Sequence, residues 1–516
     1  MSILAYADYE RAREFDADVV VVGTGAGGAV VGAELAELGH EVLFIEEGGY
    51  HAPSTFNPYT TESVPRLYRD ASATVMLGRP PIPYVEGRCV GGSTLINGGM
   101  TYRPPLRVLE HWEELGGPEL GARGLEALFE RVEANIHAAP QLEVSVGEDS
   151  KLMIAGAKKM GWRYSMNHRN QVACVGSNNC TLGCPTGAKQ STLVTYLPRA
   201  FAKGARCLTE LRVERLLILR GRCVGVEGHA IDPRTRRARR RVRVRARAVV
   251  IACGAVQTPL LLERHGLGRP SRQLGQNLSC HPNAKVVAVY PFDVEGWKGV
   301  SQVAQIREFL DDGFLFAENF VAPGVLGAYL PFHGAEAWDM MRRYNQMVMS
   351  GVLVEDSGSG SVTRALFGLP YARYDITPLD HARVKRGVKL LAEMHFALGA
   401  EYVALPFTNH HLARSVDDLK RIDELETDPS TTELFTVHIM GTARMGRRDL
   451  DSVVDLNGEL HDLPGCYVAD ASLFPTPIGV NPQVTIMALA TRVASRLKLP
   501  ARRAQPQRSR SPAASG

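Results

Sequence analysis

The chain has 516 residues, of which 45 % are hydrophobic and 22 % are charged, a composition typical of folded globular proteins. It therefore excludes disorder of the whole chain and a small disulfide scaffold, and the formal net charge of +4 is too small to indicate binding to nucleic acid or to an anionic membrane. The 50 glycines exceed the usual share but follow no triplet period, which excludes collagen. We expect the excess where the backbone approaches a ligand or another segment closely.

Cellular location is indicated by what the sequence lacks. No apolar run of about 18 residues occurs, so we predict no transmembrane helix. The first 15 residues have no basic segment followed by an apolar one, as a secretory signal would. The nine cysteines are mostly scattered and odd in number, so a disulfide framework is not expected. The default location is cytoplasmic, and export together with a partner that carries the signal is the alternative.

The predicted elements begin with a strand, a glycine-rich turn, a helix and a second strand over residues 17–47. The strand Asp18–Val22 is a buried β-branched run, residues 29–39 form an alanine-rich helix, and Glu41–Ile45 form the second strand. Further along the chain we expect helices over 105–160, several strands over 207–252, mixed elements over 300–430, a helix over 483–497 and a disordered tail over 501–516.

The arginine run Arg234–Arg247 alternates with apolar residues near its end, which is the period of a strand with one solvated face. We interpret it as a solvated hairpin that leads into a buried strand, Val249–Cys253. Nucleic-acid binding by this run is the alternative that we do not favour.

The turn between the first strand and the first helix reads Gly23-Thr-Gly-Ala-Gly-Gly28. Gly23 suits the tight turn, Gly25 lets the backbone approach a pyrophosphate, and Gly28 lets helix and strand pack closely. The helix N-terminus would then face the phosphates. Glu46 ends the second strand, 21 residues after Gly25, where its carboxylate would accept hydrogen bonds from ribose hydroxyls. This motif predicts a dinucleotide site but does not separate FAD from NAD.

Further motifs recur along the chain in a fixed order. They are GRCVGGSTLIN at 87–97, ACGAVQTP at 252–259, GQNLSCHP at 275–282, HIMGTARMG at 438–446 and GVNP at 479–482. With these motifs the chain resembles the glucose–methanol–choline (GMC) family of flavin oxidoreductases over roughly residues 15–498. The closest likeness in motif is to long-chain alcohol oxidases and bacterial cholesterol oxidases.

The resemblance implies an α/β fold with a discontinuous Rossmann-like FAD-binding domain and an inserted α+β substrate domain built on an antiparallel sheet. We expect the FAD domain to comprise residues 1–110, 200–290 and 432–500. The substrate or cap domain would comprise residues 111–199 and 291–431.

The resemblance also implies which residues contact FAD. The flavin-wrapping loop would be Gly91, Gly92, Ser93 and Asn97. Val213 would contact adenine, and Asp470 and Ala471 the ribityl–pyrophosphate region, while Pro482 would open a helix aimed at the flavin. Some relatives bind FAD covalently through a histidine just before the equivalent of Asn97; that position is Ile96 here, so we expect non-covalent FAD.

Alcohol oxidation by a flavin needs a base that removes the hydroxyl proton, and histidine has a suitable pKa without tuning. By motif, His438 matches the family's catalytic histidine and Asn481 its second polar residue. A role for Asn481 as the N-cap of a helix that begins at Pro482 is an alternative that is compatible with catalysis. That helix would direct its positive end at the flavin.

Three thiols, Cys174, Cys180 and Cys184, lie within 11 residues. This segment resembles certain FAD sugar dehydrogenases that carry an iron–sulfur cluster there, and also long-chain alcohol oxidases. The alternatives are an iron–sulfur cluster, a disulfide, and free thiols in an irregular loop.

The predicted function is FAD-dependent oxidation of the CH–OH group of a long-chain or otherwise apolar alcohol, with His438 as base and with oxygen or a redox partner as electron acceptor. A sterol oxidase and a sugar or aminocyclitol dehydrogenase are alternatives. From Ala317 to Gly327 only Glu318 is acidic, so a cholesterol-oxidase-like isomerisation is not expected. A flavin-containing lyase and a non-redox FAD-binding protein are alternatives of another class.

Overall fold

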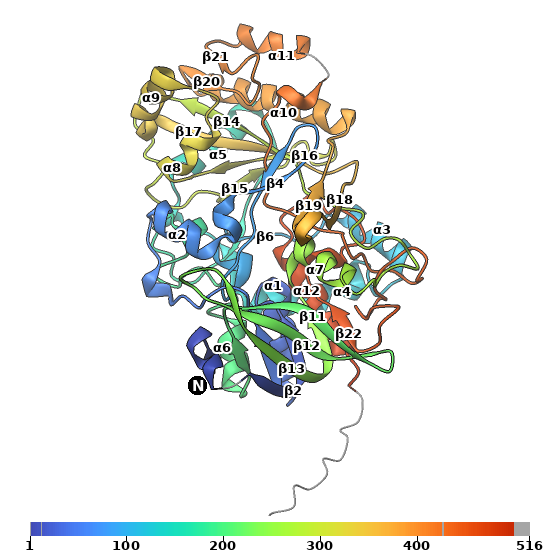
Figure 1. Cartoon of the computed structure of the whole chain (residues 1–516). Helices are drawn as coiled ribbons and strands as arrows, with labels where there is room; N and C mark the ends of the chain where they lie inside the picture. The colour runs from blue at the N-terminus through green and yellow to red at the C-terminus, as the bar shows by residue number, and fades with distance from the viewer. Residues whose placement is uncertain (1, 12, 426–427, 500–516) are drawn as a thin grey trace, which may run out of the picture.

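The computed structural model describes residues 2–11, 13–425 and 428–499, so the predicted tail at 501–516 lies outside the described residues. Two lobes, each built on one large sheet, are stacked along the long axis of the molecule (Figure 1). The first and last parts of the chain meet in the same lobe, where α12 lies beside α1.

The first sheet has eight strands in the order β1-β10-β3-β2-β13-β12-β11, and β22 also pairs with β13. Its strands are β1 (Ile3–Leu4), β2 (Glu14–Val22), β3 (Val42–Ile45), β10 (Arg206–Leu208), β11 (Leu211–Leu219), β12 (Arg222–Ile231), β13 (Ala238–Ile251) and β22 (Cys466–Val468). All pairings from β1 to β13 and that of β22 are parallel, whereas β12 and β11 add an antiparallel edge. The run Val19–Val22 is buried, as expected for the centre of a parallel sheet covered on both faces.

The second sheet has seven strands in the order β21-β20-β14-β17-β16-β15-β8, and every pairing is antiparallel. Its strands are β8 (Tyr164–Met166), β14 (Asn283–Val289), β15 (Ala304–Ile306), β16 (Phe314–Asn319), β17 (Met347–Val354), β20 (Tyr402–Ala404) and β21 (Leu412–Ala413). Smaller sheets are formed by β4 (Thr74–Met76) with β5 (Ile82–Tyr84), by β6 (Met100–Thr101), β9 (His168–Asn170) and β7 (Ala138–Pro140), and by β18 (Ser361–Arg364) with β19 (Pro370–Arg373).

Helices cover both sheets. They are α1 (Ala26–Glu37), α2 (Thr60–Leu67), α3 (Leu106–Gly116), α4 (Ala122–Asn135), α5 (Glu148–Met160), α6 (Tyr196–Ala202), α7 (Gly254–Glu263), α8 (Pro323–Tyr329), α9 (Gly334–Arg342), α10 (Pro378–Ala397), α11 (Arg421–Glu424) and α12 (Gln483–Arg496). In the first lobe α1 packs against α6 and α12, and in the second α10 packs across β14 and β17. None of the helices in the described part of the chain combines the length and apolarity that a membrane span requires.

The architecture confirms the predicted fold class, because a parallel sheet assembled from distant segments carries a second lobe on an antiparallel sheet. Two segments lie elsewhere than the expected domain ranges suggest. Strand β14, inside the range 200–290 that we assigned to the FAD domain, belongs to the second sheet. Helix α4 and the second half of α3 lie inside 111–199 but pack into the first core, where Trp112 contacts Phe474 edge-on at 5.7 Å between ring centroids.

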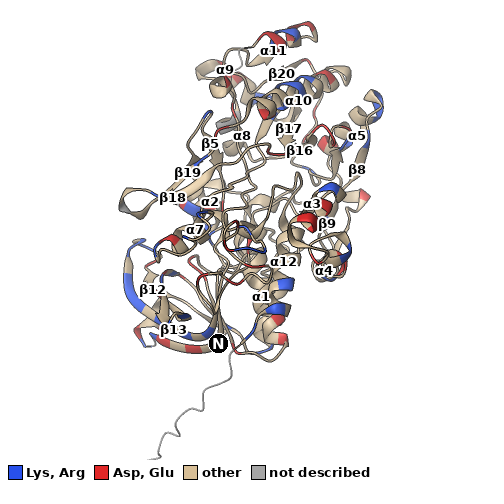
Figure 2. Cartoon of the chain, turned by 90° about the vertical axis from the view of Figure 1, so that its right-hand side faces the viewer, with Lys and Arg blue, Asp and Glu red and all other residues tan. Residues whose placement is uncertain are grey.

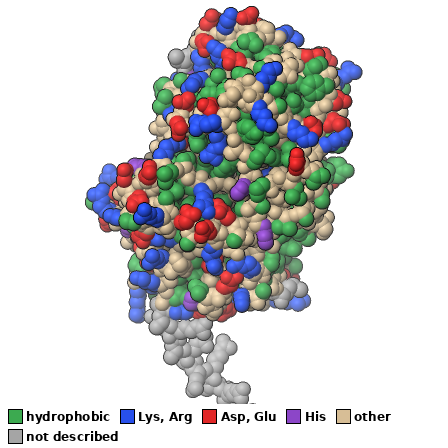
Figure 3. Space-filling model, turned by 180° about the vertical axis from the view of Figure 1, so that it is seen from behind, with side chains coloured by type: hydrophobic (Ala, Val, Ile, Leu, Met, Phe, Trp, Pro, Cys, Tyr) green, Lys and Arg blue, Asp and Glu red, His purple; other side chains and the backbone are tan. Residues whose placement is uncertain are grey.

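The arginine run begins in the turn of an antiparallel hairpin between β12 and β13, as predicted, and β13 continues without a break into the buried segment Val249–Ile251. Its arginines pair with carboxylates on neighbouring strands: Arg241 and Arg243 with Glu227, and Arg247 with Asp18. In Figure 2, blue and red segments of the ribbon mark these charged residues along β12 and β13. Figure 3 shows both signs of charge intermixed with apolar side chains on the face opposite to that of Figure 1. These ion pairs favour the solvated-strand interpretation of the run.

Candidate active site

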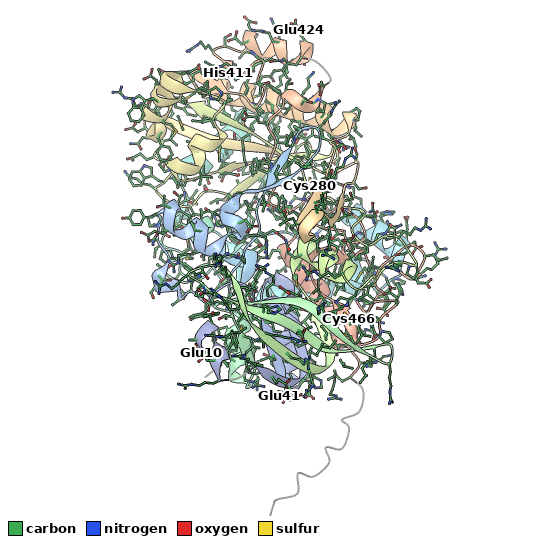
Figure 4. The ribbon with its side chains drawn as sticks, viewed as in Figure 1. Glu10, Glu41, Cys280, His411, Glu424 and Cys466 are labelled. Carbon is green, nitrogen blue, oxygen red and sulfur yellow. The ribbon has the colours of Figure 1, made fainter. Side chains whose placement is uncertain are left out.

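A cavity of about 1250 Å³ runs from the glycine-rich turn of the first lobe to the inner face of the second sheet. Three groups of residues line it: the turn with Glu46 and Val213, the loop 92–100, and the segment that carries His438 with Asn481. Cys280, which directly precedes His281, lies between the two sheets in Figure 4, whereas Cys466 marks β22 in the first lobe. All of the predicted nucleotide and catalytic residues except Gly28 and Gly91 therefore line one continuous space.

Three glycines of the turn are required by contacts within the protein itself. A Cβ on Gly23, whose φ is +104°, would lie 2.1 Å from the carbonyl oxygen of Ala252. One on Gly28 would lie 2.1 Å from the carbonyl oxygen of Gly23, and one on Gly27 would lie 1.6 Å from that of Ala469. Protein backbone already occupies these positions, so the strand, turn and helix pack as closely as the motif predicts.

Gly25 differs from its neighbours because it faces open space. The nearest atom to a Cβ built on Gly25 is the Cα of Gly92, at 3.9 Å, and the φ of −71° is one that any residue adopts. Nothing in the protein therefore requires glycine here. Because Gly25 has no side chain, a pyrophosphate could approach the backbone closely at the N-terminus of α1.

Glu46 lies at the end of β3 and lines the cavity, but its carboxylate already accepts hydrogen bonds from protein donors. The hydroxyl and amide of Thr24 donate to Oε2 at 2.7 and 3.2 Å, and the amide of Gly48 donates to Oε1 at 3.0 Å. Burial raises the pKa of Glu46, and these hydrogen bonds act in the opposite direction. Oε2 thus uses both of its acceptor positions, whereas Oε1 retains a second one for a hydroxyl donor in the cavity.

The loop 91–97 is held from two sides. Gly91 and Gly92 both have positive φ, and the amide of Gly91 donates to the hydroxyl of Thr24 at 3.0 Å. Asn97 is hydrogen-bonded to the side chain of Gln483 at the start of α12. Ser93 accepts a hydrogen bond from the amide of Gly87 at 3.0 Å. The loop therefore ties the turn of the first lobe to the start of the last helix.

Lys189, which lies outside the predicted motifs, holds this loop in place through hydrogen bonds. Its buried ammonium donates to the carbonyl oxygens of Leu95, Asn97 and Cys180 at 2.7, 2.9 and 2.6 Å. Burial lowers the pKa of Lys189 to about 8. A sequence pattern could not have identified Lys189, because the three backbone acceptors around its ammonium come from separate segments of the chain.

The remaining predicted cofactor residues also line the cavity. The carboxylate of Asp470 accepts hydrogen bonds from Gly254 at the start of α7 and from Thr258, at 2.9 and 2.6 Å, so it is held in place by the protein. Burial raises the pKa of Asp470. Ala471 lines the cavity beside Asp470. Val213 lines the cavity from β11. Pro482 takes the N-cap position of α12, one residue later than the predicted Asn481 cap, a shift within the usual uncertainty of helix ends.

His438 and Asn481 lie side by side. Nε2 of His438 is 3.2 Å from Nδ2 of Asn481, whose Oδ1 accepts a hydrogen bond from Gln305 at 3.1 Å. The side chain of Asn481 thus bonds to His438 and Gln305, and it makes no capping hydrogen bond to α12. Burial first, and the charge of Lys285 second, lower the pKa of His438 to about 4, so that its imidazole is uncharged at neutral pH.

A second imidazole, His281, stands behind the first and was not identified from the sequence. Its Nδ1 lies 3.2 Å from Nδ1 of His438, and its Nε2 accepts a hydrogen bond from the amide of Gly479 at 3.0 Å. Burial, followed by the charge of His438, holds the pKa of His281 well below its usual range. Two uncharged rings thus share one proton across the Nδ1···Nδ1 contact.

This pair restricts the tautomer of His438. Two neutral imidazoles carry two ring protons, and the inner contact uses one of them, so only one outer nitrogen can accept a hydrogen bond. The amide of Gly479 cannot turn, whereas the side chain of Asn481 can present its oxygen instead of its nitrogen. The resting pair therefore favours a proton on Nε2 of His438. To act as a base, His438 needs a lone pair at Nε2. The tautomer that provides this lone pair leaves the amide of Gly479 without a hydrogen-bond acceptor, which costs about 1–3 kcal/mol.

The three clustered cysteines are free thiols in an irregular loop, which excludes the disulfide alternative for this structure. Cys180 accepts a hydrogen bond from Arg169 at 3.5 Å, and Cys184 accepts one from the amide of Lys189 at 3.4 Å. Across residues 2–11, 13–425 and 428–499, no three His, Cys, Asp or Glu side chains gather as a group able to hold a metal ion. The cluster alternative for Cys174, Cys180 and Cys184 therefore has no support in this geometry.

A dinucleotide turn, an inserted antiparallel sheet and a His–Asn pair at their junction define a class, the flavin-dependent oxidoreductases. The family model described as GMC oxidoreductase matches residues 64–283 with its N-terminal part and residues 359–490 with its C-terminal part. The chain belongs to the GMC oxidoreductase family, whose members bind FAD.

Individual proteins agree with this assignment. An uncharacterised GMC-type oxidoreductase of Mycobacterium tuberculosis is 38 % identical, over 93 % of this chain and 75 % of that protein. A long-chain-alcohol oxidase of Arabidopsis thaliana is 25 % identical, over 95 % of this chain and 68 % of its own. The crystal structure of pyridoxine 4-oxidase from Mesorbium loti matches with a TM-score of 0.70 at 18 % identity, over 93 % of this chain and 98 % of that one, which shows the fold alone.

Proposed function

We propose that this protein oxidises the CH–OH group of a long-chain or otherwise apolar alcohol to the carbonyl, with His438 as base and non-covalently bound FAD as hydride acceptor. The observation that carries the proposal is the contact between the buried His438 and the partly buried Asn481 at the point where the nucleotide cavity meets the second sheet. The sequence similarity to the Arabidopsis long-chain-alcohol oxidase supports the substrate class.

The residues present fit FAD. The cavity is continuous from the glycine-rich turn to the catalytic pair, and Gly25 offers a bare backbone where a pyrophosphate would lie. Gly23, Glu46 and Val213 would hold the adenosine half, while the loop that contains Asn97 would hold the ring system. Ile96, which lines the cavity, has no nucleophilic atom for a covalent link. When bound, the flavin supplies an acceptor for the hydride of the carbinol carbon.

The protein's own groups handle the proton. His438 would take the hydroxyl proton at Nε2, and the amide of Asn481 would orient the substrate oxygen beside it. His281, through the shared Nδ1 contact, governs how readily that lone pair becomes available. The positive end of α12 begins one residue after Pro482, so it would favour negative charge that develops nearby.

Apolar side chains on the inner face of the second sheet support an apolar substrate. Leu315, Met349 and Leu353 line the cavity from neighbouring strands, and Phe435 lines it from the segment that leads to His438. Burying an alkyl chain against such a wall is favourable by about 0.8 kcal/mol per methylene group.

The proposal is tested by mixing the FAD-loaded protein anaerobically with a series of alcohols while the flavin absorbance is followed. Bleaching by apolar alcohols is expected, with rates that rise with chain length. If no alcohol bleaches the flavin, the redox proposal fails and a lyase or a non-redox role gains support. Admitting oxygen afterwards separates the two electron acceptors, because an oxidase is reoxidised rapidly and a dehydrogenase needs a redox partner.

A further inference from the structure

One cation faces the cavity from the inner face of the second sheet. Among the described cavity-lining residues that the second sheet contributes, Lys285 is the only charged one. It lies on β14, directly opposite Gly351 on β17. Ala317 on β16 continues the same row across the sheet. Lysine, glycine and alanine therefore stand side by side on three adjacent strands.

The two small residues leave room for the long side chain to cross the sheet. A Cβ built on Gly351 would lie 2.5 Å from Nζ of Lys285, so the ammonium rests directly over that glycine. From there it donates a hydrogen bond to Oδ1 of Asn319 on β16. It also lies 4.7 Å from the ring centroid of Phe435, three residues before His438. The cation is thus held at a defined place beside the catalytic segment.

None of the described residues provides an anionic partner for the ammonium at this place. Its hydrogen-bond acceptor is a neutral amide, and no carboxylate of the described residues lies within salt-bridge distance of Nζ. Glu318 raises the pKa of Lys285 from a distance, since it is next to Asn319 on β16 and accepts a hydrogen bond from Ser150. Burial lowers the pKa of Lys285 to about 7, as expected for a cation without a close counter-ion.

A second polar group beside the ammonium is also incompletely paired. Oδ1 of Asn283 is buried without a hydrogen-bond partner among the described residues, and it would lie 2.7 Å from the same Cβ on Gly351. The surrounding wall is apolar, with Met349 and Leu353 on β17. A cationic donor beside this apolar part of the cavity wall matches a ligand with an anionic acceptor attached to an apolar body.

We infer that Lys285 is the recognition group for a carboxylate on the substrate, so that the preferred alcohols are amphipathic hydroxy acids rather than simple alkanols. This inference rests on the proposed alcohol oxidation and specifies its substrate class. The carboxylate would accept hydrogen bonds from the ammonium, while the alkyl body packs on Met349 and Leu353.

The test compares ligands that differ only in the carboxylate. Anaerobic flavin reduction is measured with octan-1-ol and with 2-, 3- and 8-hydroxyoctanoate, using the FAD-loaded wild type and the variants K285M and K285Q. At least one hydroxyoctanoate should exceed octan-1-ol by ~10-fold or more in reduction rate over dissociation constant, the usual effect of one charge-assisted hydrogen bond. In both Lys285 variants this preference should disappear. The control K298M, which changes an exposed lysine, should retain it.

Binding gives a readout that does not depend on turnover. Calorimetric titration with octanoate should show binding to the FAD-loaded wild type and at least ~10-fold weaker binding to K285M or K285Q. Equal rates with octan-1-ol and every hydroxyoctanoate, or a preference that survives both substitutions, would overturn the inference while leaving alcohol oxidation intact. If neither ligand set bleaches the flavin, the proposed function fails, and the octanoate titration alone decides whether Lys285 binds a carboxylate.

Discussion

The glycines of the nucleotide turn have two different reasons to be glycine, and the pair Gly27→Ala and Gly25→Ala separates them. In Gly27→Ala the new Cβ would lie 1.6 Å from the carbonyl oxygen of Ala469. Contacts of this kind are essentially never under 3.0 Å, so either α1 or the Ala469 peptide must move by about 1.4 Å. Both partners are backbone, and neither can rotate away.

The expected loss of folding free energy for Gly27→Ala is about 3 kcal/mol, the upper end of the range for overpacking. Gly25→Ala meets nothing closer than 3.9 Å and keeps an ordinary φ, so it should change the stability of the cofactor-free protein by less than ~0.5 kcal/mol. Its methyl group would instead occupy the place of the pyrophosphate. A penalty of about 1–3 kcal/mol on the bound cofactor corresponds to a ~5- to 150-fold weaker affinity for FAD.

The assay has two parts. Thermal unfolding, followed by circular dichroism after removal of FAD, should show a lowered midpoint for Gly27→Ala and a wild-type midpoint for Gly25→Ala. Titration with FAD, followed by quenching of flavin fluorescence, should show weakened binding for Gly25→Ala. A wild-type midpoint for Gly27→Ala, or undiminished FAD binding by Gly25→Ala, would refute the division of roles.

Three further predictions concern the charged and titratable groups around the cavity. His438→Ala should retain FAD but reduce it at least ~10²-fold more slowly in stopped flow, and a wild-type rate would remove His438 from its role as base. Because the pKa of His438 is lowered to about 4 by burial and then by Lys285, kcat/KM should fall only as the pH drops toward 4, where the imidazole becomes protonated. Lys285→Met removes a repelling cation, so this acid limb should move to higher pH; an unchanged limb contradicts the coupling. Lys189→Met leaves three carbonyl oxygens without their donor, so FAD should dissociate measurably faster and the unfolding midpoint should fall, whereas the exposed Lys203→Met should match wild type.

The local parts of the site followed from the sequence alone. The turn from Gly23 to Gly28 is contiguous, and a buried valine run before it and an alanine-rich helix after it specify its geometry through short-range patterns. The pair His438 and Asn481 was identified because each lies in a motif of its own, and the structure brings them within 3.2 Å of one another. The hairpin of β12 and β13 was predicted, but its continuity with the buried segment Val249–Ile251 was not, because alternation does not mark where a strand stops.

Only the tertiary structure determines which groups from distant segments contact these residues. His281 meets His438 through a contact between segments that are far apart in the chain, and no periodicity links them. Lys285 reaches Asn319 only because β14, β17 and β16 align in a register that places Gly351 between them. Sequence patterns report the faces and ends of single elements, whereas the protonation of an imidazole and the unpaired charge of a lysine depend on which distant atoms come within hydrogen-bonding distance once the two sheets are packed together.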